Sequence, residues 1–148
     1  APSRLHAASL DNGKPATLPS ALADLSNIAF INADATTVAW VQGPDLTDLF
    51  AWRASWPEPQ RVVESRKDTP LQWVHVAGDI ITWDNSQAQF AADLRSGGYT
   101  QLTPQWGSTD SWGTVLHIGF APAKFDGKTP TQETIVDTSA LPPLPGCA

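Results

Sequence analysis

The feature that most constrains this chain is an internal repeat. Ala7 to Leu18 reads AASLDNGKPATL, and Ala91 to Leu102, 84 residues later, reads AADLRSGGYTQL. Each copy predicts two short strands around a tight turn, because Asn12-Gly13 and Ser96-Gly97-Gly98 supply the positive φ angles that a hairpin needs. A third copy is expected midway, over Leu49 to Val63, where a proline-rich turn replaces the glycine turn.

A second pattern alternates with this hairpin. Ile28 to Trp40 reads IAFINADATTVAW and matches Leu71 to Trp83, LQWVHVAGDIITW, 43 residues later. Each copy predicts an apolar strand, a short polar turn and a β-branched strand that ends on tryptophan. No segment sustains an apolar period of 3.6 residues with a helix cap, so we expect an all-β chain with very little helix.

A four-strand repeat of about 40 to 45 residues is typical of a β-propeller blade. Trp83 ends one strand, Asp93 to Gly97 forms the following turn, and Gln101 to Thr103 forms the last strand. In this order the chain resembles the TolB-like and WD40-like propeller repeats of secreted bacterial proteins, over about two-thirds of its length. The resemblance implies an architecture and no particular activity.

We expect a single all-β repeat domain over residues 1–140, with units near 1–22, 23–67, 68–104 and 105–140, and a proline-rich C-terminal tail over 141–148. This organisation gives about three four-stranded propeller-like blades, whereas rings need about four to eight. Each blade buries its faces only against neighbouring blades. The chain is therefore interpreted as part of a larger or oligomeric β-propeller. The alternative is a β-trefoil, which also has three four-strand repeats but closes on itself.

Composition argues against several functions. The net charge is −6, with few basic residues, which disfavours binding to the phosphates of nucleic acid. No apolar run is long enough to insert into a membrane. The chain contains no methionine, so we expect Ala1 to follow removal of a secretory signal, which predicts a secreted, extracellular or periplasmic protein. Cys147 has no second cysteine in the chain, and it is interpreted as a free thiol or as an intermolecular disulfide.

Side chains for catalysis or cofactor binding are sparse. His6, His75 and His117 have no partner at the spacing of metal ligands, and we interpret them as core or strand-face residues. The Gly-x-Ser-x-Gly and His-Glu-x-x-His motifs are absent. We therefore predict no catalytic residue, no metal and no cofactor, and an enzyme made by this chain alone is not the favoured interpretation.

The seven tryptophans are the remaining signal. Trp40 and Trp83 occupy equivalent positions in the repeat and are predicted to lie in the core. Trp73 aligns with Phe30 and is predicted to lie in the core as well.

Four other tryptophans are candidate binding residues. Trp52 and Trp56 flank a proline-containing turn, while Trp106 and Trp112 bracket a polar loop that contains Asp110. Exposed indole rings beside hydroxyl and carboxylate groups suit a carbohydrate or a peptide. These five residues are the predicted ligand-binding set.

Three functions remain open from the sequence. The first is a non-catalytic binding or scaffold module of an extracellular protein, a propeller segment completed by a second polypeptide chain or by another copy. The second is a small secreted carbohydrate-binding lectin with tryptophan-lined sites. The third is a processed chain of a larger propeller-containing enzyme.

Overall fold

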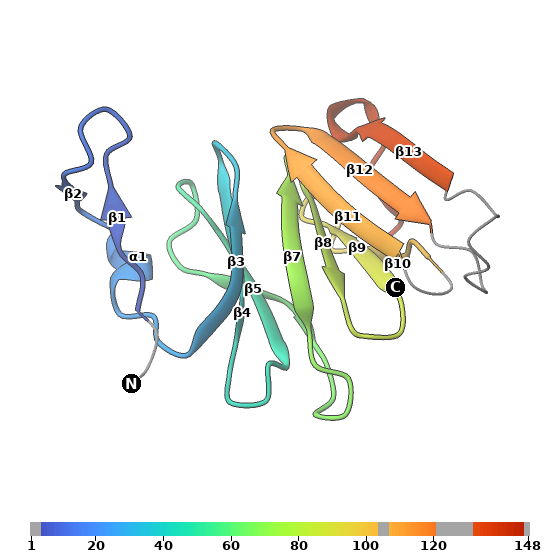
Figure 1. The fold of residues 1–148 in the computed structure, drawn as a ribbon, viewed down its shortest axis with the longest axis horizontal. Coiled ribbons are helices and arrows are strands. Elements are labelled where there is room, and N and C mark those ends of the chain that lie inside the picture. The colour runs from blue at the N-terminus through green and yellow to red at the C-terminus, as the bar shows by residue number, and fades with distance from the viewer. Residues whose placement is uncertain (1–3, 104–106, 121–131, 147–148) are drawn as a thin grey trace.

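The computed structural model describes residues 4–103, 107–120 and 132–146 (Figure 1). An N-terminal hairpin, β1 (Ala7–Ala8) and β2 (Pro15–Ala16), precedes the short helix α1 (Ser20–Ala23). The first sheet contains β3 (Ile28–Ala33), β4 (Thr37–Gln42), β5 (Asp48–Arg53) and β6 (Gln60–Glu64). The second contains β7 (Gln72–Ala77), β8 (Ile80–Asp84), β9 (Gln89–Asp93) and β10 (Tyr99–Gln101). The third contains β11 (Gly107–Trp112), β12 (Val115–Phe120) and β13 (Gln132–Asp137), followed by the 3-10 turn η1 (Thr138–Ala140).

Strand pairing in the four sheets is antiparallel and local. Within each sheet the strands neighbour one another in the order of the chain. The prediction of an all-β chain with very little helix is therefore confirmed. In the described part of the chain each sheet keeps two free edges, so no sheet closes into a barrel. No helix in the described ranges is long and apolar enough to cross a membrane.

The repeated hairpin is reproduced bond by bond. The pair Ala7–Ala16 recurs 84 residues later as Ala91–Thr100, and the pair Ala8–Pro15 recurs as Ala92–Tyr99. Both turns close with the same backbone hydrogen bond, donated by Gly13 N–H to Ser9 O at 2.9 Å and by Gly97 N–H to Asp93 O at 2.8 Å. The two glycines have φ angles of 67° and 70°, in the left-handed region that glycine adopts readily. The predicted third copy forms the β5–β6 hairpin.

The second repeated pattern also includes an irregularity. The pairing of β3 with β4 shifts between Ala29 and Asn32, and that of β7 with β8 shifts between Gln72 and His75, 43 residues later. Phe30 and Trp73 lie inside these bulges with φ angles of 48° and 49°, values that are rare for bulky residues. Their rings contact each other, with centroids 5.5 Å apart.

The three larger sheets pack face to face in chain order (Figure 1), and their first strands β3, β7 and β11 lie side by side. Val76 N–H donates to Asn32 Oδ1 at 3.1 Å, which joins the first sheet to the second. The hydroxyls of Thr82 and Thr109, 3.2 Å apart, join the second sheet to the third. Further polar contacts join the sheets near their turns, and apolar side chains fill the space between the strands.

Two apolar clusters fill these contacts. The larger cluster lies between the first and second sheets, where alternate side chains of the strands face each other. Its fully buried members include Val41, Leu49, Val76, Ile81 and Trp83.

A smaller cluster lies between the second and third sheets and contains Ala77, Leu116 and Ile118. The hydrophobic core of the described chain therefore lies between sheets that are stacked one against the next.

The predictions for the core tryptophans are confirmed in two cases and wrong in one. Trp40 and Trp83 are buried, and each stacks on a phenylalanine of the neighbouring strand, Phe50 or Phe90, with 15° between the ring planes. Trp73 is 63% exposed. Phe30, with the same bulge and a similar φ, is half-buried against the larger core cluster. The difference in exposure therefore comes from the surroundings of the two bulges, which the alignment of the repeats does not contain.

Candidate functional site

Trp52 and Trp56 lie together on the first sheet. The Trp52 indole N–H donates to Trp56 O at 3.2 Å, and the Arg53 guanidinium lies 5.7 Å from the centre of the Trp56 ring. Both indoles are half-buried, and Trp56 packs against the larger core cluster. These contacts brace the β5–β6 turn and leave only part of each ring accessible to a ligand.

Asp110 and Trp112 lie on β11 of the third sheet, away from this turn. Both are exposed, and their side chains alternate with those that face the second sheet. Trp106 and Cys147 lie outside the described residues. The structure therefore divides the predicted binding set between two sheets and does not gather it into one site.

A groove of about 630 Å³ lies between the second and third sheets, along β7 and β11. Of the described members of the predicted set, it includes Asp110 alone. The other side chains that shape it include Trp73, His75, Gln89, Ser108 and His117.

Two buried polar atoms in this groove have no hydrogen-bond partner in the described part of the chain: His75 Nδ1 and Gln89 Oε1. The nearest carboxylate oxygen to His75 Nδ1 is Asp110 Oδ1 at 3.7 Å, which is too long for a hydrogen bond. Burial lowers the pKa of His75 below its ordinary value, and the negative charge of Asp110 only partly opposes this effect. His75 is therefore neutral at physiological pH, and its imidazole offers one donor and one acceptor.

The other histidine of the groove, His117, lies on β12 with Nε2 3.4 Å from Glu133 Oε2. In the described ranges no three His, Cys, Asp or Glu side chains are grouped so that they could hold a metal ion. The groove therefore offers an exposed indole, hydrogen-bonding side chains and the carboxylates of Asp84 and Asp110.

Sequence reasoning missed Trp73, His75 and Gln89 as neighbours in one groove. His75 was predicted to be a core or strand-face residue, and Trp73 to be a core residue. In the alignment of the repeats, Trp73 stands opposite Phe30 and His75 stands opposite Asn32. This difference between the copies was the available signal. Their approach to β11 depends on how two sheets pack, which the strand pattern does not contain.

A second cleft of about 630 Å³ lies at the opposite end of the strands, between hairpin turns. Its carboxylate Asp34 accepts hydrogen bonds from the N–H groups of Thr36, Thr37 and Gly78 at 2.8 to 2.9 Å. Burial alone would raise the pKa of Asp34, but these hydrogen bonds outweigh burial and lower the pKa. Since Asp34 is already satisfied by the protein, this cleft is the weaker candidate for ligand binding.

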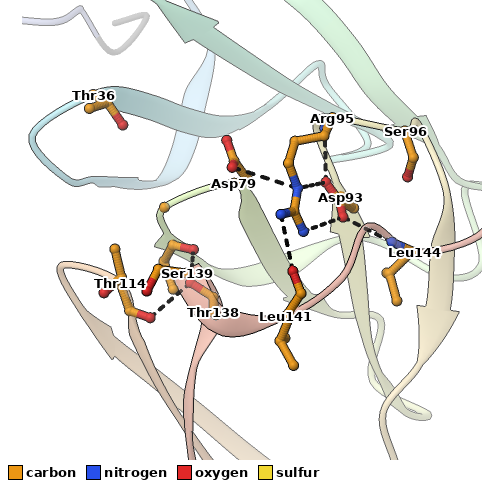
Figure 2. A network of polar contacts seen from close by, with 12 residues as sticks. Thr36, Asp79, Asp93, Arg95, Ser96, Thr114, Thr138, Ser139, Leu141 and Leu144 are labelled. Carbon is orange, nitrogen blue, oxygen red and sulfur yellow. Dashed lines mark hydrogen bonds and ion pairs between the residues drawn. The ribbon is translucent and has the colours of Figure 1, made fainter.

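Charged side chains beside this cleft form a chain across the sheets. Arg53 Nη2 lies 2.7 Å from Asp79 Oδ1, and Asp79 Oδ2 lies 3.6 Å from Arg95 Nε. Figure 2 shows Arg95 between Asp79 and the fully buried Asp93. The alternating charges connect the first sheet to the second, which indicates a structural role.

The C-terminal residues after η1 pack on this network (Figure 2). Arg95 Nη1 donates to Leu141 O at 3.2 Å, and Leu144 N–H donates to Asp93 Oδ2 at 3.0 Å. Gly98 lies directly against Pro145, where a Cβ atom would overlap the proline carbonyl. The described part of the proline-rich tail is therefore held on the second sheet.

No protein-family model matches the chain, and a comparison with curated proteins gives no match. The inference of function therefore depends on the residues of this chain alone.

Proposed function

We propose that this chain is a non-catalytic binding or scaffold module of an extracellular or periplasmic protein, built of consecutive propeller-like blades and completed by further sheets from another chain or another copy. The observation that carries the proposal is that equivalent residues of the inner strands β3 and β7 differ sharply in burial. These residues of β7 are buried by the first sheet. The equivalent residues of β3 have no sheet packed over them in the described chain.

The inner strands give the comparison directly. Val74 of β7 is 4% exposed, because it packs into the cluster between the first and second sheets. Ile31 of β3, 43 residues earlier, is 46% exposed. Likewise Val76 is buried, and its equivalent Ala33 is exposed. A sheet on the far side of β3 would bury these residues as the first sheet buries those of β7.

The N-terminal hairpin covers only part of this face. Trp40 alternates along β4 with Ala39 and Val41, which face the second sheet, so its side chain lies on the opposite face of the first sheet, where it is fully buried. Figure 1 places the N-terminal hairpin and α1 on that side of the first sheet. The hairpin corresponds to β9–β10, and β9 pairs with β8 along Ile80 to Asp84. In the described chain β1 has β2 as its only strand neighbour. The proposal therefore requires two inner strands next to β1.

The opposite end of the stack is also open. Ile135 of β13 is 69% exposed, and Trp112 of β11 is exposed on the same face. Ile135 pairs with His117 in the third sheet, and Ala91 pairs with Thr82 in the second, so Ile135 and Ala91 occupy equivalent positions. Ala91 is buried, whereas Ile135 is exposed. Exposed large apolar residues on a broad sheet face favour a protein neighbour.

Local strand pairing favours blades over the trefoil alternative. A closed trefoil barrel needs pairing between strands of different repeats, whereas the pairings between the described strands occur within one repeat. Stacked four-strand meanders with their first strands together correspond to the arrangement of propeller blades.

The native mass of the full 148-residue chain tests the proposal. Sedimentation equilibrium or native mass spectrometry is expected to give an assembly heavier than the 15.8 kDa monomer. The assembly contains either several copies of this chain or this chain with a second polypeptide. Ile31→Lys and Ile135→Lys should each weaken this assembly. Tyr99→Lys, at an exposed position of β10 in the second sheet, which lies between the other two, is the matched control and should leave it unchanged. A lone monomer that unfolds cooperatively would contradict the proposal.

A further inference from the structure

The groove between β7 and β11 contains an aromatic surface that the core does not use. The Trp73 ring is largely exposed and lines the groove, while its contact with Phe30 holds it in place. The positive φ of Trp73 is unfavourable for a side chain of this size, so the bulge maintains an orientation that a regular strand would not give. The same bulge at Phe30 supports the ring from the neighbouring sheet.

Hydrogen-bonding atoms beside this ring are left unsatisfied by the protein. Gln89 is 3% exposed, and its Oε1 has no partner among the described residues. His75 also lines the groove, with 18% of its side chain exposed, and its buried Nδ1 has no partner among the described residues. An unpaired buried acceptor destabilises the folded chain, because it has lost its hydrogen bonds to water. A ligand that donates hydrogen bonds here would remove that destabilisation.

The chemistry of the groove selects among ligand classes. Asp84 and Asp110 both line it, so their negative charges oppose a phosphate or carboxylate ligand. Gln89 Oε1 can only accept a hydrogen bond, and a neutral His75 Nδ1 accepts or donates according to its tautomer. A hydroxyl group satisfies both atoms because it donates and accepts. The C–H face of a pyranose ring also packs well on an indole.

We propose that this groove binds a neutral sugar, with a pyranose ring on Trp73 and hydroxyls hydrogen-bonded to Gln89 Oε1 and His75 Nδ1. Asp110 lies at the rim and accepts from a further hydroxyl. Among the described members of the predicted binding set, the site contains Asp110 and none of Trp52, Trp56 and Trp112. It goes beyond the proposed assembly and does not depend on it.

The test uses the full-length chain and a panel of neutral sugars: glucose, galactose, mannose, N-acetylglucosamine and their β-linked and α-linked oligomers. Saturation-transfer NMR and tryptophan fluorescence titration measure binding. We expect at least one sugar to bind and Trp73→Ala to weaken it at least tenfold. Trp112→Ala removes another exposed indole, outside the groove, and should leave the affinity unchanged.

A second variant separates binding from folding. Gln89→Met keeps a similar volume and removes the unpaired acceptor, so it should preserve thermal stability and weaken sugar binding about tenfold. Absence of binding by every sugar, or equal affinity in the wild type and Trp73→Ala, would overturn the proposal. Binding of a random peptide library through Trp73 without any sugar binding would overturn the ligand class.

Discussion

The Arg95 guanidinium donates two hydrogen bonds to the carboxylate of Asp93, from Nε to Oδ1 at 2.9 Å and from Nη2 to Oδ2 at 2.7 Å. Asp93 is fully buried and also receives the N–H groups of Arg95 and Leu144. Burial alone would raise the pKa of Asp93, but the hydrogen bonds and charge of Arg95 outweigh burial and lower the pKa. The last strands of the second sheet and the C-terminal tail therefore share one ionised group.

Replacement of Asp93 by Asn should lower the free energy of unfolding by about 2 kcal/mol at pH 7, because Arg95 loses its charged bidentate partner. A carboxyl with a lowered folded-state pKa stabilises above its ordinary value of 3.8, and that contribution is lost as pH falls through the folded-state pKa. Urea denaturation from pH 7 to pH 2 should therefore show a larger loss of stability below about pH 4 in the wild type than in Asp93→Asn.

The exposed Asp68 offers the control for this experiment. Asp68→Asn should follow the wild-type pH dependence. Parallel curves for the wild type and Asp93→Asn would show that Asp93 is not the group responsible.

Gly97 and Gly13 allow a matched test of the repeated turn. A Cβ added at either glycine meets no atom within 4 Å, so replacement by alanine adds only the strain of the left-handed backbone. That strain is about 1 to 2 kcal/mol. Gly97→Ala should lower global stability by this amount, because its hairpin belongs to a four-stranded sheet.

Gly13→Ala should act mainly on the N-terminal hairpin. Among the described strands, β1 and β2 pair only with each other, so we expect faster hydrogen exchange at Lys14 and Ala16 and a small change in global stability. Equal losses of global stability in the two variants would indicate that the hairpin unfolds together with the larger sheets.

The repeat in the fold could be predicted from the sequence because its determinants are local. Gly13 and Gly97 mark the hairpin turns, and tryptophans at equivalent strand ends mark the core positions Trp40 and Trp83. The exposure of Trp73 could not be predicted, since Phe30 in the equivalent bulge packs against the core and the cover of each ring depends on contacts between sheets. The proximity of His75 to Asp110 depends on contacts between the second and third sheets, and the sequences of β7 and β11 do not predict these contacts.

Trp40 should contribute more stability than any exposed tryptophan. It is fully buried, stacks on Phe50, and donates its indole N–H to Gln42 Oε1 at 3.1 Å. Trp40→Ala should therefore cost about 3 to 5 kcal/mol in urea denaturation. Trp112→Ala, on an exposed strand face, should cost about 0.5 kcal/mol or less in the monomer. Similar costs for the two variants would contradict the burial of Trp40.

Asn32 tests whether the first two sheets form one cooperative unit. Its Oδ1 accepts the N–H of Val76, a buried residue of the neighbouring sheet. Asn32→Ala would leave this N–H unpaired, at a cost of about 1 to 3 kcal/mol. Asn32→Asp keeps the acceptor and should retain more of the stability. If the sheets unfold together, Asn32→Ala lowers the free energy of opening, measured by hydrogen exchange, equally at Val76 and throughout β4 and β8. Faster exchange at Val76 alone would show that the two sheets open independently.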